Sequence, residues 1–142
     1  MWWPFRRAQS DGSPEHLRAG IWGEDQAAGM LKGKGYKILG RRVRIGVRDE
    51  LDIVARHNNI LVFIEVKTRK REDFGRPVSS VDRGKRHTLS RGAIRYLKKL
   101  KQKPEYFRFD VVEVVGSREA GDPLIRHIEN AFTLDPVYRI PW

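Results

Sequence analysis

The hydrophobic and polar positions of the chain fall into stretches of helical and of extended period. Leu17, Ile21, Glu24, Ala28 and Leu31 recur at spacings of three and four residues, which is the stripe of an amphipathic helix. We expect this helix to begin at residue 14 and to end in a glycine-containing segment at residues 33–35. Residues 1–13 show neither period and predict an N-terminal tail.

Segments with the alternating pattern of β-strands follow the first helix. Alternation from Tyr36 to Ile45 predicts a strand that is bent where Gly40-Arg41-Arg42 interrupts it. Apolar, β-branched runs over Glu50 to Arg56 and Ile60 to Thr68 predict two further strands. His57-Asn58-Asn59 joins them, and asparagine tolerates the positive φ of tight turns, so these two strands should form a hairpin.

A loop and a second helix come next. The loop is predicted over Glu72 to Ser80, with Ser79 or Ser80 capping a helix that runs to about Lys101. Tyr106 to Val115 then predicts a fourth strand, and a last extended segment covers residues 124–134. The order α-β-β-β-α-β with an appended extended segment predicts a single α/β domain over residues 14–142.

The hairpin brings acidic residues together. If Asn58 and Asn59 are the central turn residues, Asp52 lies directly opposite Glu65, with their Cβ atoms about 5 Å apart. Period two places Lys67 on the face of Glu65. Because like charges opposite one another destabilise a sheet, the pair indicates a compensating cation or a shifted pKa. The chain has no cysteine, so a metal there would take oxygen ligands, as Mg²⁺ and Mn²⁺ do.

Each of these acids has an ordinary structural alternative. A Glu-x-Lys pair on a strand is commonly a solvated face with a cross-strand ion pair, although Glu65 and Lys67 interrupt a strand that otherwise reads as buried. Glu24 lies within the apolar stripe of the first helix, where an unpaired carboxylate is costly to bury, so we expect it to have a partner such as a shared metal. A small shift of register would instead make Glu24 a surface acid. Glu50 stays open as the second ligand in place of Asp52.

Charge adds a candidate partner. A net charge of +11 favours binding to a polyanion, with nucleic acid first, although a merely basic or ribosome-associated protein fits the same value. The second helix and the segment before it are rich in cations. A solvated helix face is the usual explanation of such a run, but its bias of sign suggests a phosphate-binding rim. We predict this rim to comprise Arg69, Lys70, Arg71, Lys85, Arg86, Arg91, Arg95, Lys98 and Lys99.

Two absences narrow the setting. The sequence has no apolar run long enough to span a membrane and no signal peptide, and the lack of cysteine fits a reducing cytoplasm. We therefore expect a cytoplasmic protein that is not a membrane protein. A homodimer stays open.

Several short motifs occur in an order that resembles a known family. They are Gly23-Glu24-Asp25, Glu50-Leu51-Asp52-Ile53-Val54, Val62 to Arg69, Phe74-Gly75-x-Pro77, Val81-Asp82-x-x-Lys85 and Arg108-Phe109-Asp110. With Gly35-Tyr36 they resemble the YraN-type family of small bacterial proteins from about Gly20 to Phe132. One departure is Asp49, where members of that family usually have glycine.

The YraN-type family is similar to archaeal Holliday-junction resolvases within the PD-(D/E)XK nuclease superfamily. The resemblance implies a restriction-endonuclease-like fold, with a central mixed sheet flanked by helices. It places Asp52 and Glu65 at the metal-ligand positions, Lys67 at the catalytic lysine and Glu24 at the helix acid. A magnesium- or manganese-dependent nuclease acting on DNA, including branched or distorted DNA, is the function it implies.

Two other functions fit the same residues. One is a nucleic-acid-binding module that has the basic surface and no catalysis. The other is an interaction protein whose basic face meets an acidic partner. The presence of all the expected acids and the lysine favours the nuclease.

Overall fold

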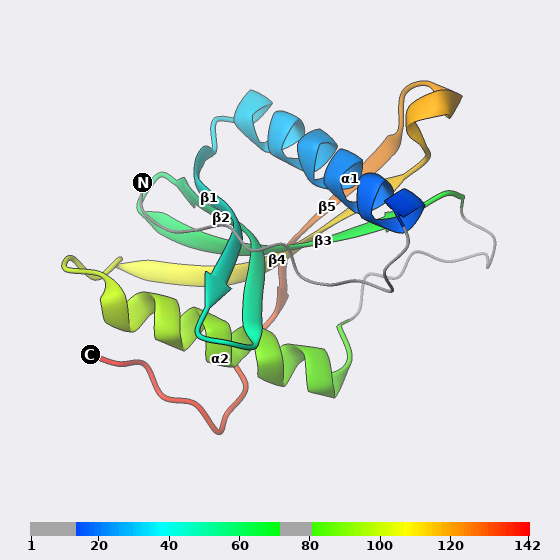
Figure 1. Ribbon diagram of the computed structural model, residues 1–142. Helices are drawn as coiled ribbons and strands as arrows, with labels where there is room; N and C mark the ends of the chain where they lie inside the picture. The colour runs from blue at the N-terminus through cyan, green and yellow to red at the C-terminus, as the bar shows by residue number, and fades with distance from the viewer. Residues whose placement is uncertain (1–13, 72–80) are drawn as a thin grey trace.

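A computed structural model describes residues 14–71 and 81–142, which form a five-stranded sheet between two long helices (Figure 1). The predicted tail over residues 1–13 and the predicted loop over residues 72–80 lie outside the described residues. The elements are α1 (Pro14–Gly33), β1 (Lys37–Ile45), β2 (Asp49–His57), β3 (Ile60–Arg69), α2 (Arg83–Lys99), β4 (Tyr106–Val115), the short 3-10 helix η1 (Arg118–Ala120) and β5 (Leu124–Phe132).

The strands lie in sequence order across the sheet. Neighbouring strands are antiparallel except β3 and β4, which are parallel because α2 crosses between them. The predicted α/β class and element order are confirmed, and the appended segment forms the edge strand β5. This mixed sheet with a helix on each face is consistent with a restriction-endonuclease-like fold.

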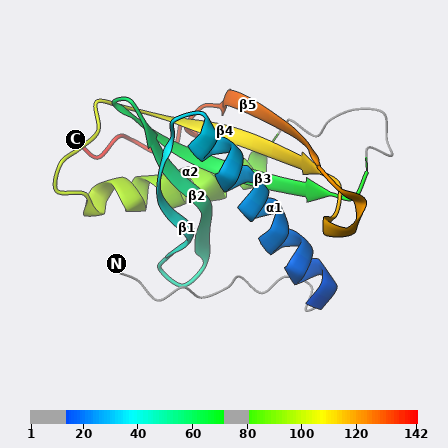
Figure 2. The same cartoon turned by 90° about the horizontal axis from the view of Figure 1, so that it is seen from above.

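Each face of the sheet carries its own hydrophobic core. Trp22, Ala27 and Leu31 of α1 pack with Ile53 and Ile64 on one face. The opposite core consists of the α2 residues Leu89, Ala93, Ile94 and Leu97 and the sheet residues Leu51, Leu61, Phe63 and Phe109. Figure 2, seen from above, shows α1 crossing one side of the sheet and α2 lying on the other. The sheet is therefore covered on both sides, as apolar strands require.

The predicted hairpin forms, and its strands pair in the register that a turn at Asn58 and Asn59 predicts. β2 and β3 pair from Ile53 with Ile64 to His57 with Ile60, and Asn58 takes a φ of 57° in the turn. The predicted bend in β1 is also present. Its register with β2 shifts beyond Ile38, and Arg42 has a φ of 51°.

The predicted serine cap of α2 is wrong, and the helix ends close to the predicted residue. The helix begins at Arg83 with Asp82 as its N-cap, not a serine, and Asp82 Oδ1 accepts a hydrogen bond from the Lys85 backbone N–H at 2.8 Å. Ser79 and Ser80 lie outside the described residues. The helix ends at Lys99, about two residues earlier than expected, because Leu100 already has extended backbone angles.

The described helices include none long and apolar enough to cross a membrane.

Candidate active site

The candidate acids lie where β2 and β3 separate. The β2–β3 ladder ends at Ile53 and Ile64, while β2 continues to pair with β1 and β3 with β4. Beyond the last pair, Asp52 Oδ2 accepts a hydrogen bond from the Val66 backbone N–H at 2.9 Å. This bond fixes the Asp52 carboxyl group to β3 at the point where the two strands part.

Asp52 and Glu65 form a coupled pair of carboxyl groups. Asp52 keeps some exposed surface, but its carboxyl group is closely surrounded by protein, and Glu65 is only 8% exposed. Burial raises the pKa of Asp52 well above its usual range, and the charge of Glu65 and a hydrogen bond with it raise that pKa further. Two such carboxyl groups favour a shared proton or a cation between them.

A lysine from α2 supplies positive charge to this pair. Lys85 Nζ lies 3.3 Å from Glu65 Oε2, and the Asp82 cap fixes the helical turn that carries it. Burial favours the neutral amine, but the charges of Glu65 and Asp52 outweigh it and raise the pKa of Lys85. Lys85 therefore stays protonated beside the acids at neutral pH.

Glu24 approaches the pair from α1. Gly23 makes this approach possible, because a Cβ at that position would overlap Thr68 Oγ1 on β3. Glu24 is 8% exposed, and Arg42 Nε donates to its Oε1 at 2.9 Å. Burial raises the pKa of Glu24 even though Arg42 lowers it, and the charge of Glu24 in turn contributes to the raised pKa of Asp52.

Lys67 and Glu113 lie on adjacent strands. The two are register partners in the parallel β3–β4 ladder, and Glu113 is 2% exposed. Arg69 and Arg126 each place a guanidinium nitrogen 3.8 Å from a Glu113 oxygen. Within the described chain, Lys67 has no hydrogen bond or ion pair, so its ammonium group is not committed to a protein acceptor there.

A cavity of about 740 Å³ opens beside the acids, between the first half of α1, the end of β3 and the segment that follows β4. Asp52 and Glu24 line it, together with Arg18, Arg69 and Arg118. Its volume lies within the range of about 300–1,000 Å³ that is typical of ligand pockets. It gives a solvent-filled route to the Asp52 carboxyl group.

Comparison with known proteins identifies the family. Residues 23–114 match the model of the uncharacterised protein family UPF0102. The chain belongs to this family. A UPF0102 protein of Syntrophotalea carbinolica is 43% identical over 122 residues, which cover 85% of this chain and 96% of the relative. One from Symbiobacterium thermophilum is 42% identical over 115 residues, covering 81% of this chain and 96% of the relative.

The UPF0102 match confirms the predicted YraN-type membership. It runs from Gly23, beside the helix acid, to Val114 in β4, so it contains Glu24, Asp52, Glu65, Lys67 and Lys85. The edge strand β5 and the segment after it lie beyond the matched residues.

A second buried carboxylate in the UPF0102 region ties β4 to β5. Asp110 is hydrogen-bonded to Arg108 Nε at 2.9 Å, to His127 Nε2 at 2.7 Å and to the Asn130 backbone N–H at 2.9 Å. Burial alone would raise the pKa of Asp110, but these three contacts outweigh it and lower that pKa. The Arg108-Phe109-Asp110 motif therefore carries a structural network.

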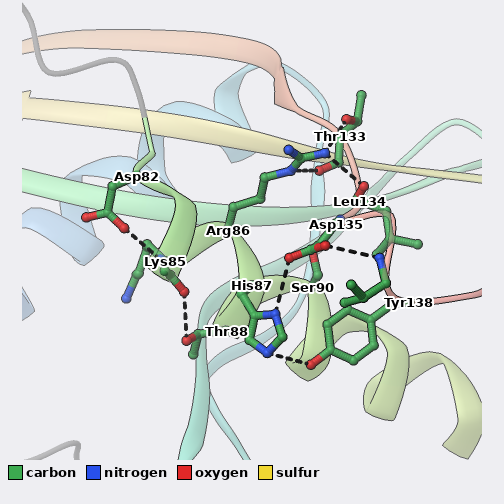
Figure 3. Close-up of polar contacts among 12 residues, drawn as sticks. Asp82, Lys85, Arg86, His87, Thr88, Ser90, Thr133, Leu134, Asp135 and Tyr138 are labelled. Carbon is green, nitrogen blue, oxygen red and sulfur yellow. Dashed lines mark hydrogen bonds and ion pairs between the residues drawn. The ribbon is translucent and has the colours of Figure 1, made fainter.

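Several residues of the predicted basic rim have partners within the protein. Lys70 pairs with Glu15 at 3.0 Å, and Arg91 binds Asp49 at 2.7 Å. Arg86 donates to Thr133 and to the Leu134 carbonyl of the C-terminal segment (Figure 3). Lys98 and Lys99 are exposed on α2, and Arg71 is exposed at the end of the first described range. The exposed residues of the rim thus include Lys98 and Lys99 in the second half of α2.

The donor set suits a hard cation. Asp52, Glu65 and Glu24 offer carboxylate oxygens, which are the ligands that Mg²⁺ and Mn²⁺ prefer. The coupled Asp52–Glu65 pair, enclosed by protein, is the feature that fits a cation. As they stand, the described residues contain no group of three acidic or histidine side chains arranged to hold a metal. Arg42 holds Glu24, so Asp52 and Glu65 are the pair best placed to bind one.

Two residues near the acids were not found from the sequence. Arg42 lies among four arginines and lysines of β1, and nothing in that run singles it out. The sequence could have indicated Glu113, because it is an acid within the apolar strand β4, just as Glu65 is an acid within β3.

Proposed function

We propose that this protein is a metal-dependent, endonuclease-like phosphodiesterase that acts on DNA, including branched or distorted DNA. The observation that carries the proposal is the Asp52–Glu65 carboxyl pair, enclosed where β2 and β3 part, with the Lys85 ammonium at 3.3 Å from Glu65. A fold that needed only stability would replace such a pair with apolar residues at little cost.

Asp52 and Glu65 would hold Mg²⁺ or Mn²⁺, with Glu24 as a third acid nearby. When bound, the ion would lower the pKa of a water molecule and neutralise charge that develops on the phosphate. Lys67 has no described protein acceptor and is available to orient water or to pair with the scissile phosphate. Lys85 balances the charge of Glu65 and keeps the acid pair compatible with a folded, metal-free protein.

A binding module without catalysis is the second candidate, and one observation favours it. Arg42 occupies Glu24 at 2.9 Å, which leaves two acids rather than three for a metal. If Arg42 does not release Glu24, the site binds metal weakly and the protein acts by binding alone.

A cleavage assay over single-stranded, duplex and four-way-junction DNA, with and without Mg²⁺ or Mn²⁺, separates the two. We expect divalent-dependent cleavage by the wild-type protein and none by Glu65→Gln. The matched control is Glu105→Gln, an exposed acid outside the site, which should cleave like wild type. Absence of cleavage over the whole panel, or undiminished cleavage by Glu65→Gln, would exclude the enzyme and favour the binding module.

A further inference from the structure

We propose that the β1–β2 turn, residues 46–48, inserts an apolar side chain into a groove of duplex nucleic acid; the class of partner rests on the proposed function. The turn carries Val47, whose exposed fraction of 86% is the highest of any large hydrophobic residue in the described chain. An apolar side chain held this far into solvent gains free energy only when a partner covers it.

The surroundings of Val47 are cationic. Ile45 at the end of β1 and Gly46 of the turn, with Arg95, Lys98 and Lys99 of α2, line a shallow groove of about 260 Å³. Among the described residues, no acid lines this groove. Such a groove attracts anionic groups, and the phosphates of a nucleic acid fit it.

Contacts within the protein hold the turn in place. Gly46 has a φ of 67°, and a Cβ there would lie 2.6 Å from Arg95 Nη1, so the turn sits directly against α2. Arg44 Nη2 donates to the Val47 carbonyl at 3.0 Å. At its base, Asp49 binds Arg91 through two hydrogen bonds. A preorganised tip loses little conformational entropy on binding.

An exposed apolar side chain beside cations is an arrangement with which some proteins bind in a groove of DNA. Arginine and lysine bind the phosphates, while an apolar side chain wedges between base steps and kinks the duplex. Five residues separate Val47 from Asp52, a distance of at most about 17 Å along an extended strand. That length corresponds to about five base pairs of a duplex.

The test compares two exposed valines. Fluorescence anisotropy measures binding of wild-type protein, Val47→Ser and Val137→Ser to duplex and junction DNA in chelator, without divalent metal. Val137, 69% exposed in the C-terminal segment, is the matched control. We expect Val47→Ser to weaken binding by about tenfold, as for returning one apolar side chain to water. The slope of affinity against salt should not change, because no charge is removed.

A double variant Lys98→Ala/Lys99→Ala gives the complementary result. It should reduce the slope of log affinity against log salt by about two, because two phosphate contacts are lost. Binding of Val47→Ser at wild-type affinity, or an equal loss for Val137→Ser, would overturn the wedge. So would a wild-type protein that binds no duplex, or that binds phosphatidylglycerol vesicles through Val47 in preference to DNA. Val47-dependent binding without any cleavage would keep the wedge and remove the nuclease.

Discussion

Asp49 accepts hydrogen bonds from both Nε and Nη2 of Arg91, at 2.9 and 2.7 Å, and is itself only 1% exposed. The bidentate pair ties the first residue of β2 to the middle of α2. Asp49 stands where the resemblance leads one to expect glycine, and an extra carboxylate at this point could have altered the acid site. Its side chain instead contacts the helix on the side of the β1–β2 turn.

Removing the Asp49 carboxylate should destabilise the fold. Asp49→Ala leaves the Arg91 guanidinium, 18% exposed, without its carboxylate partner, and loss of one member of a buried pair costs about 3 kcal/mol. Urea unfolding measures the change. Asp122→Ala, in an exposed loop, is the control and should have little effect. The double variant Asp49→Ala/Arg91→Leu should recover much of the loss; no recovery would mean that the pair is not the cause.

The raised pKa of Asp52 predicts a cost in stability at neutral pH. A carboxyl group whose pKa is higher in the folded state stabilises the protein below its unfolded pKa of about 3.9, and that contribution is lost as the pH rises through the folded pKa. Asp52→Asn removes the charge and keeps an oxygen for the Val66 N–H. In chelator we expect it to be more stable than wild type by about 1 kcal/mol at pH 7, with a smaller difference at pH 4.

Thermal unfolding with added Mg²⁺ supplies the second arm of the Asp52 experiment. Wild-type protein should gain stability from the metal, because binding to the folded state alone shifts the equilibrium. Asp52→Asn should not gain. An Asp52→Asn protein that is less stable than wild type at pH 7 without metal would contradict the raised pKa.

Two glycines of α1 provide a matched pair. Gly23→Ala would place a Cβ against Thr68, forcing α1 away from β3 and moving Glu24, at a cost of about 1–3 kcal/mol. Gly29 lies in the same helix with open space around it, so Gly29→Ala should stabilise by about 0.5–1 kcal/mol through higher helix propensity. Chemical denaturation distinguishes the two. Equal effects of both substitutions would show that the close approach of helix and strand is not limiting.

The sequence predicted those features that local chemistry decides. The β2–β3 offset followed from asparagine in the turn, and it brought Asp52 and Glu65 to the same end of the hairpin. The buried face of α1 followed from the period of its apolar residues. Glu24 was found because a carboxylate interrupts an apolar stripe, and a buried carboxylate needs a partner.

The partners of long side chains were beyond such reasoning. Arg86 and Arg91 looked like members of a solvent-facing rim, yet one binds the C-terminal segment and the other binds Asp49. Helical period gives the direction in which a side chain leaves its helix. Which acceptor an arginine reaches depends on segments distant in sequence, here by more than 40 residues.

Lys85 should compete with a metal for Glu65. Its ammonium lies 3.3 Å from Oε2, and a half-exposed pair of this kind is worth up to about 1 kcal/mol. Lys85→Met should therefore tighten Mg²⁺ binding by up to about fivefold, measured by calorimetry without nucleic acid. Lys99→Met, on the exposed face of the same helix, is the control and should leave metal affinity unchanged. Weaker Mg²⁺ binding by Lys85→Met would show that the lysine supports the metal site rather than competing with the ion.

Acids and exposed cations should affect cleavage and binding in opposite ways. Glu65→Gln removes a negative charge that faces the phosphates, so DNA binding without metal should be equal to or tighter than that of wild type while cleavage is lost. Reversing Lys98, Lys99 and Lys101 to glutamate should weaken binding to all DNA sequences, because these residues are exposed and contacts with phosphates carry no sequence information. At saturating DNA the reversed variant should keep most of its kcat, since its acid pair is intact.

Anisotropy in chelator gives the affinities, and single-turnover cleavage in Mg²⁺ gives the rates. If the reversed variant bound and cleaved DNA like wild type, the DNA would lie elsewhere on the protein. If it bound DNA like wild type but did not cleave it, α2 would take part in the chemistry itself.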